Sequence, residues 1–223
     1  MWRLAFWANL LLVLLSLAPV QRVTACSCLR QHPQTQFCSS DFVILVKVKS
    51  VNGVLQDGSP LNSYRVKIKK IFKATPEAEV VLKKNHLWTA SNSAACGVNL
   101  DVDETYVLAG RVFDGKARIA SCYFNQKWAN VSNVERKGFK RLYSRGCMCQ
   151  IMYTPWYRKA AVLDQAGRKG CIWESTPGPE DCQLNYGVCK KGPAGCSWEA
   201  SVPYKNCILD YQRKRELQRS LEP

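Results

Sequence analysis

Short segments of alternating apolar and polar residues occupy the first half of the chain, and this pattern is typical of β-strands with one buried face. Residues 41–51 start as a continuous apolar run and then alternate, so the first half of this strand is expected to be buried on both faces. Residues 63–72 alternate more regularly, and turn-forming residues lie between the two segments, which predicts a hairpin with a long tip. The side chains expected to point inward are Tyr64, Val66 and Ile68, and those expected to point outward are Arg65, Lys67 and Lys69.

Three further strands are predicted downstream of this hairpin. They cover residues 79–83, 104–113 and 117–124, and a turn at Asp114-Gly115 joins the last two. Five short strands with turn signals at this spacing favour either a small closed barrel or a sandwich.

A helix is predicted after the strands, because apolar residues recur at three- and four-residue steps from Trp128 to Leu142. Gly138 interrupts this pattern, and the helix is expected to end at Gly146. Asn130 begins an Asn-Val-Ser sequon and is therefore a candidate glycosylation site. This part of the chain is thus expected to be mainly β with helices.

The spacing of cysteines changes near residue 148 and divides the chain into two parts. Six cysteines are spread over residues 26–147, whereas six more are crowded into residues 149–207. A segment of about 60 residues rarely holds together by apolar burial alone, so disulfides are expected to replace burial in the second part. From Gln212 the chain is polar and basic and is expected to form a mobile tail.

The amino-terminal residues have the layout of a secretory signal peptide. Arg3 gives a positive start, residues 4–18 are almost all apolar, and Val23-Thr24-Ala25 is a small-residue cleavage signal. The apolar run is short for a membrane span, so cleavage after Ala25 is favoured over a retained anchor. The mature, secreted chain is therefore predicted to begin at Cys26.

All twelve cysteines follow the predicted cleavage site. An even number of cysteines in a secreted chain predicts six disulfides, although the spacing alone leaves their pairing open. The alternative is a structural zinc site built from Cys26 and Cys28 or from Cys147 and Cys149. One intervening residue is fewer than the two to four that zinc sites use, so disulfides are the better interpretation.

Basic residues outnumber acidic ones, and the formal net charge is +15. Residues 1–25 carry two arginines and no acid, so the mature chain keeps a charge of +13. Such a surplus favours polyanionic partners, and sulfated glycosaminoglycans of the extracellular matrix are more plausible outside the cell than nucleic acid. The basic residues that cluster most closely are Lys67, Lys69, Lys70, Arg213, Lys214 and Arg215.

No catalytic motif is present in the sequence. There is no His-Glu-x-x-His, no Gly-x-Ser-x-Gly and no glycine-rich phosphate loop. A cationic secreted hydrolase such as a ribonuclease would need two cooperating histidines, and the chain has only His32 and His86. Both are expected to lie in surface loops without partnership, so neither enzyme activity nor a cofactor of its own is predicted.

The tripeptide Cys26-Ser27-Cys28 is the most informative short motif. If each cysteine is bridged to a distant part of the chain, the tripeptide becomes a rigid ridge, and its terminal amine and the Cys26 carbonyl lie on one side of a five-membered chelate suited to zinc. The segment from Cys26 to Cys38 resembles the start of the mature tissue inhibitors of metalloproteinases, which open Cys-x-Cys, then His-Pro-Gln, then Phe-Cys. The likeness continues in order through the segments 43–47, 72–73, 90–98, 106–110 and 146–149.

The resemblance implies a fold and a division of the chain. It implies a five-stranded OB-fold (netrin-like) barrel followed by a small disulfide-rich C-terminal subdomain. The expected boundaries are 1–25 for the signal peptide, 26–148 for the inhibitory domain, 149–211 for the C-terminal subdomain and 212–223 for the tail. The disulfides carried over from the family are Cys26–Cys96, Cys28–Cys122, Cys38–Cys147, Cys149–Cys196 and Cys171–Cys189, which leaves Cys182–Cys207.

The second part departs from the vertebrate members of this family. Those members have a closely spaced cysteine pair soon after the position of Cys149, and residues 151–170 contain no cysteine here. Cys182 and Cys207 appear instead, a pattern closer to invertebrate members. This departure puts in doubt functions that vertebrate members assign to this subdomain.

The resemblance also implies a secreted inhibitor that forms a 1:1 complex with zinc metalloproteinases. The amine and carbonyl of Cys26 would chelate the catalytic zinc of the target, and no nucleic acid and no membrane insertion would be involved. The residues implied to contact the protease are Cys26, Ser27, Cys28, Leu29, Ser93, Ala94 and Ala95. The alternative is a netrin-like module that binds matrix glycosaminoglycan without inhibiting a protease.

Overall fold

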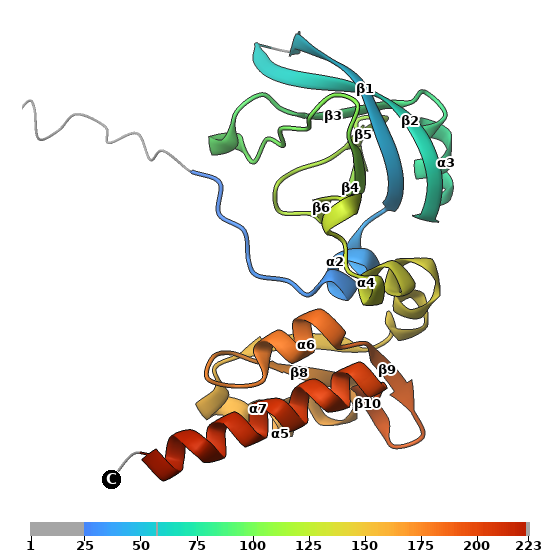
Figure 1. Cartoon of the computed structure of the whole chain (residues 1–223). Helices are drawn as coiled ribbons and strands as arrows, with labels where there is room; N and C mark the ends of the chain where they lie inside the picture. The colour runs from blue at the N-terminus through green and yellow to red at the C-terminus, as the bar shows by residue number, and fades with distance from the viewer. Residues whose placement is uncertain (1–24, 57, 222–223) are drawn as a thin grey trace, which may run out of the picture.

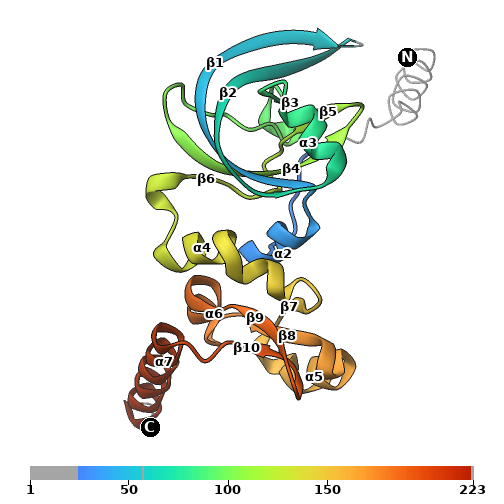
Figure 2. The ribbon, with the colours of Figure 1, turned by 90° about the vertical axis from the view of Figure 1, so that its right-hand side faces the viewer.

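The computed structural model describes residues 25–56 and 58–221, which form two stacked halves. In Figure 1 a β-rich half lies above a disulfide-rich half, with helices α2 (Pro33–Ser39) and α4 (Asn133–Lys137) between them, and Figure 2 shows the same order from the side. The predicted signal peptide falls almost wholly on residues 1–24, outside the described part of the chain. Among the described residues, no helix combines the length and the apolar character that crossing a membrane requires.

Six strands of the β-rich half form one sheet in the order β1-β2-β3-β5-β4-β6. Strand β1 also pairs with β4, so five of these strands close into a ring. Every pairing is antiparallel except that of β3 with β5, which is parallel. The strands are β1 (Phe42–Gln56), β2 (Ser59–Ala74), β3 (His86–Ala90), β4 (Thr105–Phe113), β5 (Lys116–Arg118) and β6 (Asn125–Lys127).

The predicted hairpin is confirmed, because β1 and β2 pair antiparallel along their whole length. The apolar run at the start of β1 contributes to both faces: Phe42 and Ile44 join one buried cluster, while Val43 joins another. On β2, Tyr64 and Val66 are buried and Ile68 packs against the same cluster, while the alternate basic side chains are exposed, as expected from the period of two.

The strand predicted at residues 79–83 is wrong, since this segment belongs to helix α3 (Pro76–Leu82). Thr75 caps the helix by accepting a hydrogen bond from the Ala78 amide at 3.2 Å, and Pro76 suits the first helical position. The side chains of Ala78, Val81 and Leu82 then share one buried face at helical spacing. In the sequence, the adjacent apolar residues of this segment resembled a short strand, so the helical period was not recognised.

The strand predicted at residues 117–124 is also only partly correct. Strand β5 ends at Arg118, the chain turns through Cys122, and the short strand β6 begins at Asn125. The fifth strand of the ring is instead β3, which was not among the predicted strands. The turn at Asp114-Gly115 is as predicted, and both residues have positive φ, at 51° and 62°.

The predicted helix after the strands is present but broken into short turns. Its pieces are η2 (Trp128–Asn130), α4, the π-helical turn η3 (Gly138–Leu142) and η4 (Tyr143–Gly146). Ser132 and Glu135 cap α4 reciprocally, at 3.2 and 2.8 Å. Gly138 is required because the ring of Tyr143 occupies the space that a Cβ atom would need.

The disulfide-rich half contains two small sheets and several short helices. Strands β7 (Gln150–Thr154) and β8 (Gly170–Glu174) are parallel, and β9 (Cys189–Gly192) and β10 (Gly195–Trp198) are antiparallel. The helical elements are η5 (Trp156–Arg158), α5 (Lys159–Ala166), η6 (Gly167–Lys169), α6 (Glu180–Tyr186) and α7 (Val202–Leu221). The residues from Gln212, which were expected to form a tail, continue α7 as far as Leu221.

The twelve cysteines form six disulfides, and none is free. The pairs are the same six that the family resemblance implies: Cys26–Cys96, Cys28–Cys122, Cys38–Cys147, Cys149–Cys196, Cys171–Cys189 and Cys182–Cys207. The first three disulfides join cysteines within residues 26–147 and the last three join cysteines within residues 149–207, so no disulfide links one of these segments to the other.

Candidate functional site

An exposed segment without helix or strand, residues 26–29, runs along the surface of the β-rich half, and we call it the terminal ridge. Disulfides attach it to the body at two points, Cys26 and Cys28, with Cα–Cα distances of 5.1 Å in both bridges. Because the two attachments are separated by a single residue, the tripeptide cannot rotate about either one alone. Ser27 and Leu29 are exposed, and 86% of the Leu29 surface is open to solvent.

The two disulfides of the ridge lie side by side. The sulfur of Cys26 is 3.9 Å from that of Cys28 and 3.9 Å from that of Cys122, and the sulfur of Cys96 is 3.7 Å from that of Cys122. Four cysteine sulfurs within 4.8 Å would suit a metal ion if they were thiolates. Here all four are consumed in disulfides, so this cluster is a covalent clamp and holds no ligand for zinc.

A short turn, η1 (Ser93–Ala95), forms the surface next to the ridge. The side chain of Asn92 caps it by accepting a hydrogen bond from the Ala95 amide at 2.8 Å. Cys96 then adopts a left-handed conformation with φ of 60°, which turns the chain back toward the body. Gly97 follows because a Cβ atom there would collide with the carbonyl oxygens of Ala90 and Asn92.

Cys26 and the η1 turn are joined by a backbone hydrogen bond. The nitrogen of Cys26 donates to the carbonyl oxygen of Ala94 at 2.8 Å, and the Cys26–Cys96 disulfide closes the same contact covalently. The amide of Ser121 donates to the Cys96 carbonyl at 2.9 Å, which ties in the loop that carries Cys122. The structure thus brings residues 26–29 and 93–95 together on one exposed surface.

The hydrogen bond to Ala94 and the Cys26–Cys96 disulfide both restrain the backbone nitrogen of Cys26. A terminal amine at Cys26 would carry two hydrogens and a lone pair when neutral, and the bond to Ala94 uses only one hydrogen. The lone pair and the Cys26 carbonyl would remain free to bind a metal ion on another molecule.

The two histidines lie in different parts of the molecule, and the expectation that both lie in surface loops is wrong, because His32 is buried and His86 belongs to strand β3 and is half-buried. His32 is only 1% exposed, and its ring lies against Tyr143, Trp173 and Trp198. Its Nδ1 accepts a hydrogen bond from the Gln34 amide at 3.1 Å, which caps α2, and its Nε2 lies 3.0 Å from the Gln183 carbonyl. The aromatic neighbours come from residues more than one hundred positions away, so no local pattern revealed this burial.

Burial lowers the pKa of His32 from 6.5 to about 4, and the hydrogen bond to the Gln183 carbonyl opposes this shift only in part. Both ring nitrogens are already used in structural hydrogen bonds. His86 begins β3, and its Nδ1 lies 2.8 Å from the Lys84 carbonyl. Helix α2 and strand β3 lie well apart in Figure 1, so the two histidines do not form an acid–base pair.

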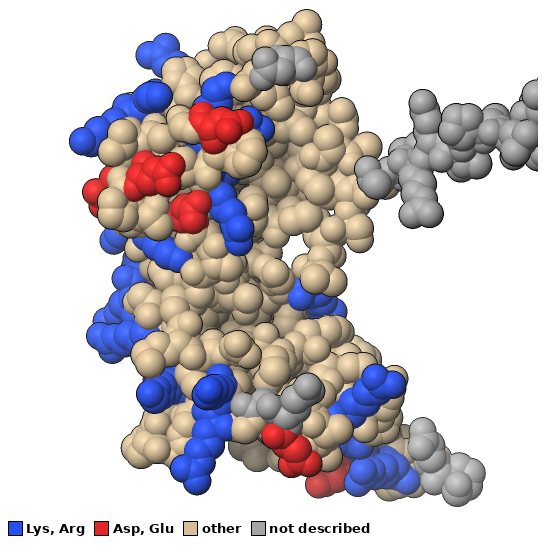
Figure 3. Space-filling model, turned by 180° about the vertical axis from the view of Figure 1, so that it is seen from behind, with Lys and Arg blue, Asp and Glu red and all other residues tan. Residues whose placement is uncertain are grey.

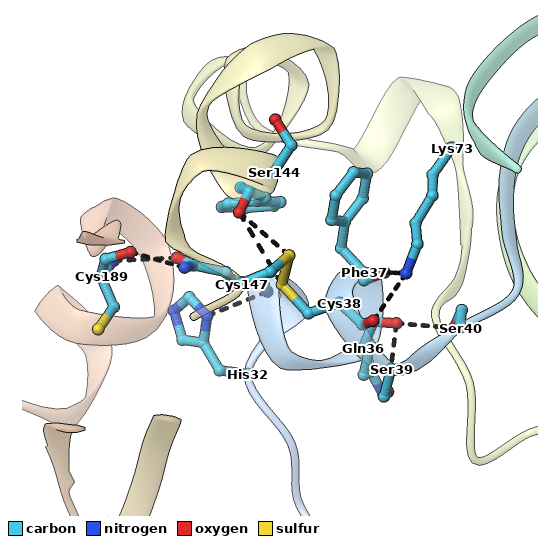
Figure 4. The surroundings of a disulfide bond; sticks show 12 residues. His32, Gln36, Phe37, Cys38, Ser39, Ser40, Lys73, Ser144, Cys147 and Cys189 are labelled. Atoms are coloured by element: carbon cyan, nitrogen blue, oxygen red, sulfur yellow. Dashed lines mark hydrogen bonds between the residues drawn. A yellow bond between two sulfur atoms is a disulfide. The ribbon is translucent and has the colours of Figure 1, made fainter. Parts of the chain in front are cut away.

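The junction between the halves is built around helix α2, the segment that follows the ridge. Figure 4 shows the Cys38–Cys147 disulfide with His32 and Cys189 on one side and Phe37 and Lys73 on the other. The side chain of Gln34 exchanges two hydrogen bonds with the Cys189 backbone, at 2.6 and 2.9 Å. Lys73 of β2 donates to the carbonyls of Phe37 and Cys38 at the end of α2, at 3.0 and 2.6 Å.

Basic side chains gather on one face of the β-rich half. Lys49, Arg65 and Lys67 line a surface hollow of about 590 Å³ together with Val66, Ile68 and Asn85. Figure 3 shows Lys and Arg side chains along one edge of the molecule, from the β-rich half toward the other half. The second predicted cluster, residues 213–215, lies on α7, where Arg213 pairs with Asp210 at 3.4 Å.

The remaining candidate site is Asn130, which is exposed at the end of η2. The serine of its sequon, Ser132, is the cap of helix α4. An attached glycan would therefore start on the surface, beside a fixed helix end.

Comparison with known proteins finds a family and several relatives. The sequence profile of the family described as "Tissue inhibitor of metalloproteinase" matches residues 24–198. The protein of that name from Drosophila melanogaster is 30% identical over 165 residues, which cover 74% of this chain and 73% of the relative.

Two vertebrate proteins are similar to the chain over comparable lengths. "Metalloproteinase inhibitor 3" of Scyliorhinus torazame is 33% identical over 187 residues, covering 81% of this chain and 83% of the relative. "Metalloproteinase inhibitor 2" of Homo sapiens is 38% identical over 157 residues, covering 66% and 69%. Helix α7 begins after the last residue that the family profile matches.

Proposed function

Because the chain belongs to the tissue inhibitor of metalloproteinase family, whose members are inhibitors and not enzymes, we propose that it is a secreted inhibitor that binds zinc metalloproteinases one to one. The ring of five strands supports the assignment of the β-rich half to the OB-fold (netrin-like) class. In this proposal residues 26–148 are the inhibitory domain, 149–211 the C-terminal subdomain and 212–223 a basic terminal segment.

The observation that carries the proposal is the fixed position of the Cys26 nitrogen. A disulfide and a 2.8 Å hydrogen bond to Ala94 both hold this atom at an exposed surface. Removal of residues 1–25 would convert it into a free amine. Signal cleavage would therefore create the inhibitory group as well as release the chain for secretion.

The chemistry of the proposed contact follows from the zinc site of the target. A catalytic zinc has three protein ligands and an open position that normally holds the attacking water. The amine and carbonyl of Cys26 would bind this zinc and displace that water. The zinc belongs to the protease, so the chain needs no cofactor of its own.

The rest of the ridge would occupy the cleft of the protease. The side chain of Ser27 would enter the pocket beyond the metal, and Cys28 and Leu29 would continue along the cleft as a substrate does. Residues 93–95, which the Cys26–Cys96 disulfide joins to the ridge, would flank it in the cleft. Leu29, at 86% exposure, is the largest apolar side chain of the ridge and gains most from burial in a partner.

High affinity would follow from rigidity. The two side-by-side disulfides order the ridge before the protease arrives, so less conformational freedom is lost on binding. The ridge would resist cleavage because the water is displaced and no peptide bond of the mature chain spans the zinc.

The proposal is tested by titrating the mature chain, beginning at Cys26, into a zinc endopeptidase catalytic domain at known concentration. We expect loss of peptidase activity to end at one equivalent of chain, with no effect on a serine protease. If one equivalent or a large excess leaves the zinc endopeptidase fully active, the proposed function is wrong.

A second candidate function is binding of sulfated glycosaminoglycan, and the basic hollow at Lys49, Arg65 and Lys67 favours it. The test is the salt concentration that elutes the chain from immobilised heparin. Replacing all three residues with alanine should lower this concentration, whereas the same change at Arg213, Lys214 and Arg215 on α7 should lower it less. Equal elution of the wild type and the first variant would remove the hollow as the binding site.

A further inference from the structure

Leu29 is the last residue of the terminal ridge, and Arg30 and Gln31 follow it and lead to the buried His32. This stretch thus runs from the β-rich half toward the other half (Figure 1). All three residues are exposed and belong to no helix or strand. Within the described chain they make no backbone–backbone hydrogen bond. The bridged Cys28 and the buried His32 hold the two ends of this stretch, and side-chain contacts can order the residues between them.

Arg30 supplies such a contact. Its guanidinium forms an ion pair with Glu180, the first residue of α6, and donates a hydrogen bond to the hydroxyl of Tyr153 at 3.4 Å. The guanidinium carbon also lies over two aromatic rings, 5.3 Å from the centre of Tyr153 and 5.1 Å from that of Trp173. All three partners belong to the disulfide-rich half.

The receptor for this guanidinium is held in place without Arg30. Glu180 is 5% exposed, and one of its carboxylate oxygens accepts hydrogen bonds from the amide and the hydroxyl of Thr176, both at 3.0 Å. Trp173 is 1% exposed and donates from its ring nitrogen to the Glu180 carbonyl at 3.2 Å. A buried carboxylate of this kind is costly unless it is paired, so it retains the guanidinium strongly.

We propose that Arg30 is a positioning residue for inhibition: held by Glu180, Tyr153 and Trp173, it fixes the direction in which the chain leaves Leu29. The inference rests on the proposed function. Its consequence is that Glu180, Tyr153 and Trp173 raise the affinity for the protease through Arg30 and not through contacts of their own with the protease. A lysine would keep the charge but lose the planar group that stacks on two rings while pairing with a carboxylate.

The test measures the inhibition constant, Ki, for a zinc endopeptidase in the full mature chain. Arg30→Ala is expected to raise Ki roughly tenfold, because the residues after Cys28 must then be ordered on binding. Glu180→Gln is expected to raise Ki in the same direction, and since Glu180 is buried, this effect cannot come from a lost contact with the protease. The double variant should be no weaker than Arg30→Ala alone.

Two further variants keep the test decisive if Glu180→Gln does not fold. Tyr153→Leu removes one ring and one hydroxyl at a half-exposed position, 41% open to solvent, and should raise Ki severalfold. Arg30→Lys should recover part of the loss seen in Arg30→Ala. The matched control is Lys159→Ala, which breaks the 2.8 Å ion pair with Glu174 in the same half and should leave Ki unchanged.

A second readout reports the positioning directly. Backbone NMR order parameters of Leu29 and Gln31 should fall below about 0.6 in Arg30→Ala and in Glu180→Gln, but not in Lys159→Ala. Order parameters that stay unchanged in both Arg30→Ala and Glu180→Gln would overturn the proposal.

The outcomes distinguish failure of the proposed function from failure of the positioning role of Arg30. A wild-type chain that fails to inhibit contradicts the proposed function itself. If the wild type inhibits and Arg30→Ala has the same Ki, the positioning role is wrong. If Arg30→Ala weakens inhibition while Glu180→Gln and Tyr153→Leu do not, Arg30 acts by touching the protease, and the positioning role is again wrong.

Discussion

Two large apolar clusters lie in the β-rich half and the helices next to it, with Val188 as the one buried member from the disulfide-rich half, whereas the other cluster of that half is small and its buried members are Cys149, Cys171 and Cys189. The disulfides differ in the same sense. Those of the first half close separations of 70, 94 and 109 residues, and those of the second close 47, 18 and 25. The first half can thus fold by burial, while the second depends on closely spaced cross-links.

The terminal ridge is exposed, and residues next to it contact both halves of the molecule. The ridge buries little of its own surface, so its order comes from the disulfides to the first half and from Arg30, which reaches the second. The first half contributes the disulfide partners Cys96 and Cys122, and the second contributes the buried carboxylate of Glu180.

Removing core volume from the β-rich half should have the largest effect. Leu108 is 0% exposed within the first cluster, so Leu108→Ala should lower the free energy of unfolding by about 4 kcal/mol. Denaturant unfolding measures this change. Val80→Ala, at a helix position 62% exposed, is the control and should change it by less than about 0.5 kcal/mol. A loss below about 1 kcal/mol for Leu108→Ala would contradict a first half that is held by burial.

Opening one cross-link of the second half should have a local effect. Replacing Cys182 and Cys207 with serine frees a loop with a separation of 25 residues and should cost about 3 kcal/mol. Helix α7 has no buried residue among those described, so its amide protection in hydrogen exchange should be lost. Protection in β1 should stay unchanged, and equal losses in α7 and β1 would show that the halves unfold together.

Acid should weaken the junction through His32. The pKa of this buried imidazole is about 4 when folded and 6.5 when unfolded, so the unfolded chain binds more protons between these values. Stability is therefore full above pH 6.5 and falls by about 3 kcal/mol as the pH drops to about 4.

The measurement is the free energy of unfolding from pH 7 to 4, compared between the wild type, His32→Gln and His86→Gln. The wild type and His86→Gln should lose stability with the same slope, and His32→Gln should lose less. Three parallel slopes would mean that His32 does not carry the acid sensitivity.

A second pH effect should act on binding and is the smallest of the set. The Cys26 amine must be neutral to bind zinc, and a free α-amino group has a pKa of about 7.7–8.0. Lowering the pH from 8 to 6 should therefore raise Ki roughly forty-fold, after correction for the pH profile of the protease. A flat Ki over this range would exclude the amine as a ligand. His32→Gln should follow the same profile, because the histidine governs stability and the amine governs binding.

The sequence predicted what depends on local periodicity and on the position of cysteines. The β1–β2 hairpin, the Asp114-Gly115 turn and a helical stretch after Trp128 were all visible as patterns. Helix α3 was missed because a seven-residue helix shows only two turns, and its Thr75 cap and Pro76 were the signals that could have revealed it. Strand β3 was missed because its pairings, at five positions with β2 and at Trp88 with Arg118 of β5, are tertiary features.

The candidate site could also be predicted only in part, because its residues come from distant parts of the chain. Residues 26–29 and 93–95 were named through a family resemblance, and their closeness depends on disulfides that spacing alone does not specify. His32, Gln34 and Arg30 could not be interpreted locally, since their partners lie between about 120 and 155 positions further along the chain. A buried histidine such as His32 and a half-buried one such as His86 cannot be told apart in sequence, because the residues that bury His32 belong to the opposite half.

The most direct test of the central claim extends the mature chain by one alanine before Cys26 and measures Ki against a zinc endopeptidase. The extension converts the Cys26 amine into an amide, whose nitrogen lone pair is delocalised into the carbonyl group and does not bind zinc, while both ridge disulfides and the body of the inhibitor remain. Zinc chelation by Cys26 predicts a loss of inhibition by several orders of magnitude, with an unchanged free energy of unfolding. Equal inhibition by the extended and the native chain would contradict it.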